Sequence, residues 1–552
     1  MIDLTDICCM HGIFFSVLLP AYQFYNEDAA LSLSINVAQR WMNLFQTEYF
    51  DHDIIDGIDT AIKDETTMAW YDMSVGQRIP RQAFLLDIVA RQEGQDDLFC
   101  DLFRSMIFQM EMLSQDRFWM GHNNHGLYQS LGQLAAARRF KFLAGFDKYF
   151  DLAQQRTSTI LRKQFFTSGV HTEHSPAYHK MVLRSVLGAL HSGLIEDQSL
   201  AELLEQSEDA LRWMVTPDGS LSTFGDTDYT QDKEFENVRP LGLKAYKDAG
   251  YVFARKANEQ GSSHDSYFAQ MAAFHSRTHK HADHLSLIWH ENGKRILIDP
   301  GRYGYGPKTV LGDELSMAGH YYSDPNRRYV ESTRAHNCVE IDGVDHKRKG
   351  AKPFGSALLF AEEMQGLWLT LCEVRHRHVR HFRLVIISPG DFLLVMDWLK
   401  DGTGAEHDYR QWFQLAPEWA LSGADGILSA SCHDTKLKVV SLISNTTLGD
   451  IYSGTTDPMQ GWHSPKAGVL EPSTSFNFHT RGNTARFATL FSLSDHINID
   501  SLKLNEILSK GELSWRNNEN RYRLIFKRYD TKLNASLKKS SGLNNYLKSW
   551  YM

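Results

Sequence analysis

The sequence predicts an α+β protein with two domains: an N-terminal domain of stacked helical hairpins over residues 1–235, and a C-terminal antiparallel β-sandwich over residues 236–552. Three observations lead to this fold class. The chain has 552 residues, which is more than one ordinary domain holds. Before residue 235, apolar residues recur at helical spacing. After it, short apolar runs alternate with turn residues.

Six segments of the first part have apolar residues three and four positions apart, which is the spacing of one helix face. They are residues 29–46, 97–113, 129–150, 152–165, 179–191 and 200–215. The polar connections between them are short, and this favours antiparallel neighbouring helices. The last segment ends at Thr216-Pro217-Asp218-Gly219-Ser220, a turn sequence that contains both proline and glycine.

The strongest strand signal in the second part is a hairpin. Residues 285–290 and 295–299 are apolar, and the turn Glu291-Asn292-Gly293-Lys294 joins them. Residues 382–388 and 392–398 repeat the pattern around Pro389-Gly390-Asp391. Many strands separated by turns predict stacked antiparallel sheets. Further predicted strands cover residues 337–341, 367–374, 438–444, 487–493 and 521–529.

The composition is that of a globular protein and argues against several classes. Hydrophobic residues make up 42% and charged residues 23%, so extensive disorder is not expected. The formal net charge of −9 gives no support to nucleic-acid binding, which normally needs a basic surface. No apolar run is long enough to span a membrane. The six cysteines contain no CxxC pair, so neither a zinc ribbon nor a disulfide framework is expected.

The apolar stretch Gly12–Ala21 resembles the core of a secretory leader. However, Asp3 and Asp6 precede it and no lysine or arginine does, whereas a leader begins with positive residues. We therefore expect a structural helix or a clipped start. The cellular compartment stays open on this evidence.

The 25 histidines are the most informative part of the composition, because they gather with other polar residues in four segments. In Gly121-His122-Asn123-Asn124-His125-Gly126, an amide and an imidazole stand side by side and can hold a carboxylate and exchange a proton. The alternative is a helix cap. Residues 171–179 hold three histidines, Glu173 and Tyr178, whose hydroxyl suits a general acid or base. Ser175 is also a good N-cap, which would fix where Tyr178 points.

The other two segments suggest a metal site. His279 and His281 would face opposite sides of a strand, so they should have different roles. Asp299 ends the paired strand, and His336 lies in Ser332-Thr333-Arg334-Ala335-His336-Asn337. A set of two histidines and one aspartate suits zinc, with a position left for water or substrate. The alternative for each histidine is a satisfied core residue. Because the four segments lie in both halves of the chain, we expect one site where the domains meet.

Together these segments resemble the heparinase II/III-like polysaccharide lyases. The order NNHG, HSPAYH, HKHADHLSLIWHENGKRILIDPG and STRAHN carries the resemblance, with PDGSLSTFGDTD (217–228) and DPGRYGYG (299–306). It covers residues 120–345 best and is slight in the first hundred residues. The resemblance implies an (α/α) toroid followed by an antiparallel β-sandwich. Alginate lyases share this architecture and motif order, so the sugar is not fixed.

The resemblance also implies roles for individual residues. Asn124 matches the amide that neutralises the uronate carboxylate, and His125 a histidine that assists it or acts as base. Tyr178 matches the tyrosine that protonates the leaving oxygen and, for some epimers, takes the C5 proton. His279 matches a second active-site histidine from the β domain.

A metal set and three substrate contacts complete the assignment. His281, Asp299 and His336 match a zinc set that in this family looks structural. Candidate substrate-binding residues are Glu173, Tyr305 and Arg334. The resemblance therefore implies β-elimination on an anionic polysaccharide, with no nucleic acid and no membrane span involved. It also implies a periplasmic or secreted enzyme, or a cytoplasmic one if the missing leader is real.

Two other function classes and one unusual strand remain. A zinc-dependent glycan hydrolase would use the metal for chemistry, and a non-catalytic uronate-binding or assembly protein would give no product. Residues 374–383 read Val-Arg-His-Arg-His-Val-Arg-His-Phe-Arg, which is unusually basic for this chain. They are either a solvated strand edge or a wall of the cleft that binds the polyanion.

Overall fold

The structure is a computed structural model that describes residues 18–49, 53–64, 67–121, 123–235, 240–424, 427–493, 497–504, 510–517, 520–529 and 532–541. The chain divides into two compact units. The helical unit is Met1–Phe165 with Val182–Leu204, and the sheet unit is Phe166–Met181 with Glu205–Met552. In the described ranges, no helix is both long and apolar enough to cross a membrane. Most of the leader-like stretch, residues 12–17, lies outside these ranges.

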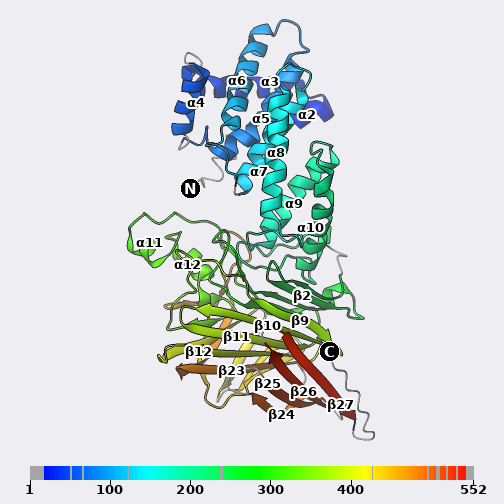
Figure 1. Ribbon diagram of the computed structural model, residues 1–552, viewed down its shortest axis with the longest axis vertical. Coiled ribbons are helices and arrows are strands. Elements are labelled where there is room, and N and C mark those ends of the chain that lie inside the picture. Colours follow the sequence, from blue (N-terminus) through cyan, green and yellow to red (C-terminus); the bar gives the residue numbers. More distant parts are fainter. Residues whose placement is uncertain are drawn as a thin grey trace. The chain divides into compact units, whose positions relative to one another are not determined.

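The N-terminal part of the described chain is helical, as predicted (Figure 1). Predicted segments 29–46, 97–113, 179–191 and 200–215 each agree with an observed helix to within three residues. The helices are α2 (Leu18–Tyr25), α3 (Asp28–Phe45), α4 (Ile54–Lys63), α5 (Asp72–Val89), α6 (Asp96–Ser114), α7 (Asn124–Arg139), α8 (Asp147–Gln164), α9 (Pro176–His191) and α10 (Ala201–Met214).

The prediction of one helix over residues 129–150 was wrong. α7 ends at Arg139, and α8 begins at Asp147. Gly145 between them has φ +85°, a backbone conformation that interrupts a right-handed helix and is readily adopted by glycine. Basic residues close the last turn of α7, and Asp147 opens α8, as the helix dipole favours.

Helix α5 had no counterpart among the predicted elements. Its interior contains Pro80, and polar residues such as Arg78 and Gln82 are buried, so no one-sided apolar stripe exists. It is held instead by close packing on α7. A Cβ atom added to Gly76 would lie 2.7 Å from the backbone of Gln129, and one added to Gly132 would lie 1.9 Å from the carbonyl oxygen of Gly76. The two glycines let these backbones touch.

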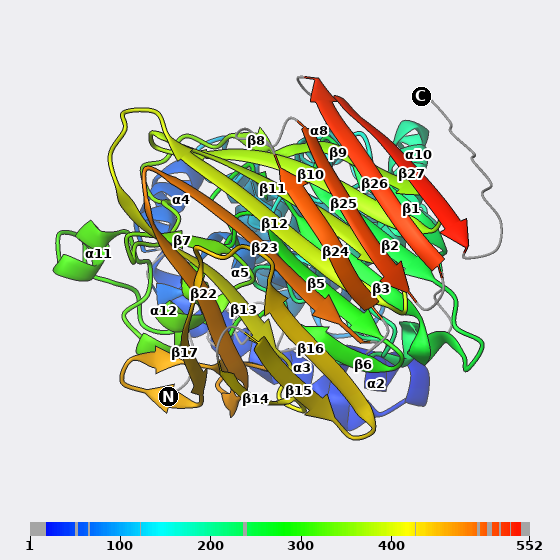
Figure 2. The same ribbon diagram turned by 90° about the horizontal axis from the view of Figure 1, so that it is seen from below.

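The sheet unit contains three principal antiparallel sheets in its described part (Figure 2). This confirms the prediction of stacked antiparallel sheets. The first sheet has the order β1-β2-β3-β5-β6-β13-β22-β17, and β7 also pairs with β13. Its strands are β1 (Gly242–Tyr246), β2 (Tyr251–Lys256), β3 (Ser266–Met271), β5 (Ser286–Glu291), β6 (Lys294–Leu297), β7 (Val339–Ile341), β13 (His407–Leu415), β17 (Thr447–Ser453) and β22 (Thr474–Gly482).

The second sheet has the order β14-β15-β16-β23-β12-β11-β10-β9, and the third has the order β24-β25-β26-β27. Strands of the second are β9 (Leu358–Met364), β10 (Leu367–His376), β11 (Val379–Ser388), β12 (Phe392–Asp401), β14 (Ala420–Ala424), β15 (Ile427–Cys432), β16 (Thr435–Ser441) and β23 (Thr484–Ser492). Strands of the third are β24 (Ile497–Leu504), β25 (Lys510–Asn517), β26 (Asn520–Tyr529) and β27 (Lys532–Ser541).

The second sheet is the middle layer, because both of its faces are buried. In β11, Val385 and Ile387 join a core with Trp289 of the first sheet. Leu384 and Ile386 join a core with the third sheet. Side chains of a strand alternate between its faces, so a continuous apolar run such as 384–387 is what a strand covered on both faces requires. Burying each such side chain stabilises the fold by about 1.5–3 kcal/mol.

Both predicted hairpins are present. In the first, Asn292 and Gly293 have φ +51° and +72°, as a tight two-residue turn between β5 and β6 requires. The expectation that His279 and His281 lie on a strand was wrong. Residues 275–285 form a loop before β5, and His279 has φ +55°. The two histidines have different partners, Glu173 for His279 and Asp226 for His281, and their different roles stay a prediction.

Candidate functional site

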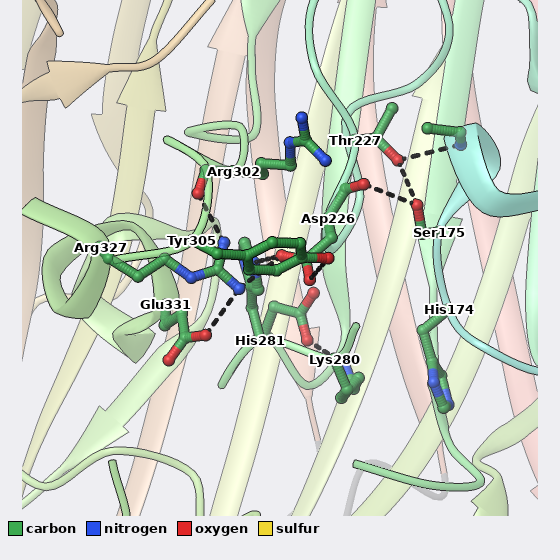
Figure 3. Close-up of polar contacts among 12 residues, drawn as sticks. His174, Ser175, Asp226, Thr227, Lys280, His281, Arg302, Tyr305, Arg327 and Glu331 are labelled. Atoms are coloured by element: carbon green, nitrogen blue, oxygen red, sulfur yellow. Dashed lines mark hydrogen bonds and ion pairs between the residues drawn. The ribbon is translucent and has the colours of Figure 1, made fainter. Parts of the chain in front are cut away.

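The first turn of α9 sets the position of Tyr178. Ser175 caps the helix, because its Oγ accepts a hydrogen bond from the Tyr178 backbone N–H at 3.3 Å. The same hydroxyl donates to the carbonyl oxygen of Asp226 at 2.9 Å. Thr227 Oγ1 accepts from the Ala177 N–H at 3.2 Å. The predicted cap therefore exists, and it ties the start of the helix to residues 226–227; Figure 3 shows Ser175 in contact with Asp226 and Thr227.

Three other predicted site residues, Tyr305, His279 and Glu173, lie around Tyr178. Its hydroxyl lies 2.8 Å from that of Tyr305. The ring of His279 stacks on the ring of Tyr178, with centroids 3.5 Å apart and planes 17° apart. His279 Nδ1 lies 3.1 Å from Glu173 Oε2. Burial raises the pKa of Tyr178, so the phenol is protonated at neutral pH and available as a proton donor.

Asp226 lies at the centre of this group, and sequence reasoning did not single it out. Its Oδ2 accepts from the hydroxyl of Tyr305 at 3.1 Å. Its Oδ1 lies 3.0 Å from His281 Nε2 and 2.6 Å from Arg327 Nη2. Burial would raise the pKa of Asp226, but Arg327 and His281 hold it well below its ordinary value. Asp226 is therefore a buried carboxylate anion that joins three side chains (Figure 3).

Gly225 makes this placement of Asp226 possible. It has φ +55°, and an added Cβ atom would lie 2.4 Å from the carbonyl oxygen of His279. The next residue, Asp226, donates its N–H to the same oxygen at 3.1 Å. The close approach of the two backbones requires glycine. The available signal was the phrase PDGSLSTFGDTD, which contains both residues.

The predicted metal set also comes together. His281, Asp299 and His336 are fully buried and offer ligand atoms within 4.8 Å of one another. His336 Nδ1 lies 2.8 Å from Asp299 Oδ2. The other atoms, His281 Nδ1, Asp299 Oδ1 and His336 Nε2, have no hydrogen-bond partner among the described residues. Three buried nitrogen and oxygen atoms without hydrogen-bond partners are suitable ligands for a zinc ion.

A second group of histidines fits a metal less well. His284, His346 and His376 also offer atoms within 4.8 Å. However, their rings are nearly parallel, with planes 13–25° apart. Both nitrogens of His346 are engaged: Nδ1 accepts from the His284 N–H, and Nε2 lies 2.9 Å from the carbonyl oxygen of Val339. The group is a stack of neutral imidazoles, because desolvation lowers their pKa values.

Over its whole length, the basic segment 374–383 matches neither predicted alternative, a solvated strand edge or a wall of the cleft. β11 lies between β10 and β12, so it is not a sheet edge. His381 and Arg383 are buried and bind Asp397 at 2.7 and 2.8 Å. The exposed positive groups are Arg377 and His378 at the turn and Arg375 on β10. Two of the seven basic side chains of the segment therefore serve the sheet core.

Arg334 is not grouped with the tyrosine pair. Its carbonyl oxygen accepts from the side chains of Gln414 and Gln460. Its predicted role in substrate binding stays a prediction. Arg302 is closer to the group: it forms a two-point ion pair with Asp228, and its guanidinium lies 5.7 Å from the ring centroid of Tyr305.

The helical unit holds the other two predicted catalytic residues. Asn123 caps α7, because its side chain accepts from the backbone N–H groups of His125 and Gly126. His125 Nδ1 lies 3.0 Å from Oδ1 of Asp72, a buried carboxylate of α5. Nδ1 therefore carries the proton, and Nε2 keeps its lone pair. Asn124 is part-exposed on the first turn. His122 lies outside the described residues.

Two further histidines of segment 171–179, His171 and His179, are structural. The burial of His179 predicts that the folded state loses stability at low pH. His179 Nδ1 accepts from the His171 N–H, and Nε2 lies 2.8 Å from the Ser207 carbonyl oxygen. Burial lowers the pKa of His179 to about 3. In the unfolded chain its pKa is about 6.5, so the unfolded state binds the proton first as pH falls. At pH 5 this costs the folded state about 2 kcal/mol, and the loss disappears above about pH 7.

The measurement is the free energy of unfolding at pH 5 and at pH 7, for the wild type and for His179→Gln. The amide nitrogen of glutamine can replace the Nε2 donor, but it does not titrate. We expect the difference between the two pH values to shrink by about 2 kcal/mol in the variant. An unchanged difference would show that His179 is already protonated in the folded state or does not titrate between these pH values.

Comparison with known families identifies both parts of the chain. The model of the heparinase II/III N-terminus matches residues 22–251, and the heparinase II/III-like C-terminal model matches residues 238–496. Together they span residues 22–496. No curated protein matches the chain significantly.

Solved structures of the same architecture cover nearly the whole chain. The heparan sulfate lyase HepC from Pedobacter heparinus is 16% identical, with 92% of this chain and 80% of that chain covered and a TM-score of 0.68. The heparinase III that is the BT4657 gene product is 15% identical, with 95% and 85% covered and a TM-score of 0.73. Another heparinase III is 15% identical, with 94% and 82% covered and a TM-score of 0.72. The likeness confirms the predicted fold, an (α/α) toroid followed by a β-sandwich.

Proposed function

The chain belongs to the heparinase II/III-like family and is thus a polysaccharide lyase, and we propose that it cleaves a uronic-acid-containing polysaccharide by β-elimination. The proposed substrate is a heparan-sulfate-like glycosaminoglycan, because HepC, a solved neighbour of the same fold, is described as a heparan sulfate lyase. Alginate and bacterial surface glycans are the other uronic-acid polymers to test.

The observation that carries the proposal is the environment of Tyr178. A lyase must protonate the glycosidic oxygen that leaves, and the donor must be protonated at neutral pH. Burial raises the pKa of Tyr178, which keeps its proton in place. Tyr305 holds its hydroxyl and His279 covers its ring, so the donor is fixed before substrate arrives.

Asn124 and His125 would act where the C5 proton is removed. The proton at C5 is barely acidic while the neighbouring carboxylate keeps its full charge. Hydrogen bonds from Asn124 would stabilise the enolate-like charge that develops when this proton leaves. His125 would accept the proton at Nε2, because Asp72 holds the proton of Nδ1. The C4–O bond then breaks, and Tyr178 protonates the departing oxygen, leaving an unsaturated uronate.

We also propose that His281, Asp299 and His336 hold a zinc ion with a structural role. When bound, the ion would supply no step of the elimination, but would fix the loop and strand ends that carry its ligands. His279 lies two residues from His281 on that loop. The protein's own side chains would therefore perform the proton transfers, and the metal would hold in place the loop that carries His279.

The test is a product scan with purified protein and a panel of heparan sulfate, heparin, hyaluronan, alginate and bacterial capsular polysaccharides. Elimination creates a conjugated double bond that absorbs in the far ultraviolet. We expect an absorbing product from heparan sulfate. Reducing ends without absorbance would instead indicate a hydrolase. Tight binding of a glycan without product would indicate a binding or assembly protein, and either result would overturn the proposal.

A further inference from the structure

We propose that Asp226 is a positioning residue that orients a metal ligand and the catalytic tyrosine pair with one carboxylate. The inference rests on the proposed function for the role of Tyr178, and on the proposed zinc set for the role of His281. It concerns a residue that contacts neither substrate nor metal in these assignments. Three connections of Asp226 carry it.

The first connection is from Oδ1 to His281. A carboxylate anion can only accept a hydrogen bond, so the nitrogen 3.0 Å from it, His281 Nε2, must carry the proton. A neutral imidazole has one N–H and one lone pair, and the lone pair is then at Nδ1. Nδ1 is the atom of His281 that has no partner among the described residues. Asp226 thus selects the tautomer that can bind a cation.

The second connection is from Oδ2 to Tyr305. A phenol has a single proton, and Tyr305 donates it to Asp226 at 3.1 Å. The oxygen of Tyr305 can then only accept from Tyr178, 2.8 Å away. The resting direction of the Tyr178 proton is therefore set by Asp226. When Tyr178 has given its proton to the leaving oxygen, rotation of the Tyr305 hydroxyl lets it donate to the phenolate, without movement of any heavy atom.

The third connection is through the backbone and through Arg327. The carbonyl oxygen of Asp226 accepts from Ser175, the cap of the helix that carries Tyr178. Arg327 Nη2 lies 2.6 Å from Asp226 and 2.7 Å from Glu331, and its guanidinium lies 5.4 Å from the ring centroid of Tyr305. Asp226 and Arg327 each have a 2% exposed side chain. The carboxylate is held on both sides and cannot turn away from either partner.

The experiment compares three variants of the full chain. Asp226→Asn offers an acceptor to only one of the two partners and presents an N–H to the other. Tyr305→Phe removes the hydroxyl link alone. Asp232→Asn is the matched control, since Asp232 lies in the same segment and pairs with Lys180 near the surface. Three quantities are measured: kcat and KM for elimination, the zinc dissociation constant with zinc alone as the probe, and thermal stability.

We expect Asp226→Asn to lower kcat about 10–100-fold and to weaken zinc binding by a similar factor, with KM changed less than about threefold. Tyr305→Phe should lower kcat and leave zinc binding as in the wild type. Asp232→Asn should change neither. Since Asp226 acts on Tyr178 through Tyr305, the double variant should have a kcat no lower than the worse single variant. If the losses in kcat of the two single variants multiplied in the double variant, the inference would be overturned.

A wild-type zinc dissociation constant or a wild-type kcat in Asp226→Asn would also overturn it. If this variant does not fold because Arg327 has lost its anion, Asp226→Asn/Arg327→Gln removes both charges and carries the same two readouts. Zinc binding does not depend on activity. A wild type without lyase activity therefore defeats the proposed function, while unchanged zinc binding in the variant of an active enzyme defeats this inference alone.

Discussion

Replacing Tyr178 with phenylalanine is expected to lower kcat for elimination by about 10²–10⁴-fold, the range that a positioned general acid contributes. The ring remains, so its stacking on His279 at 3.5 Å and its place at the start of α9 are kept. Only the hydroxyl and its hydrogen bond to Tyr305 are lost. The leaving oxygen then departs without the proton that the Tyr178 hydroxyl supplies. Ultraviolet detection of product under saturating substrate measures the effect.

The control for this substitution is Tyr246→Phe. Its hydroxyl lies 3.5 Å from Asp209, and Tyr246 has no part in the proposed chemistry. This variant should keep kcat within about twofold of the wild type, and both variants should melt within a few degrees of it. If Tyr178→Phe retained a tenth or more of the wild-type kcat, the proton would have to come from another donor, and the assignment of Tyr178 as general acid would be wrong.

The sheets could be predicted from the sequence because each strand is read locally. The turn Asn292-Gly293 fixes a hairpin by its backbone conformation, and the apolar run at 384–387 requires burial on both faces. A third layer could not be predicted, because the sequence does not say which sheet covers the second face. Helix α5 was missed for a related reason: Gly76 packs against α7, and such contacts leave no periodic apolar pattern.

In the site, too, some residues could be predicted from the sequence, whereas others depend on contacts between distant parts of the chain. Tyr178, His281 and His336 stand in segments dense with chemically active side chains, so they could be singled out from the sequence. Asp226 was not singled out within its phrase, because its importance depends on partners 55 and 79 positions further along the chain. The local sequence does not distinguish a functional aspartate in a turn from one that only forms the turn. Asp72 is missed for the same reason, since its partner His125 is 53 positions away.

Replacing His336 with alanine is expected to abolish bound zinc and to destabilise the sheet unit. His336 is fully buried, and its Nδ1 lies 2.8 Å from Asp299 Oδ2. The substitution removes one of three ligands and leaves a buried carboxylate without this partner, which costs about 3–5 kcal/mol. Loss of the metal adds to this, because an ion that binds only the folded chain stabilises it. Zinc content per chain and the free energy of unfolding are the measurements.

His284→Ala is the matched control, because it also removes a buried imidazole but comes from the stacked histidine group. Both variants leave a cavity of similar size, so both lose stability by packing. Only His336→Ala should lose zinc, since His281, Asp299 and His336 each offer an unpaired ligand atom, whereas both ring nitrogens of His346 in the stacked group are engaged. Added zinc should raise the melting temperature of His284→Ala and leave that of His336→Ala unchanged. Zinc retained in His336→Ala, or lost in His284→Ala, would move the metal site to the other group.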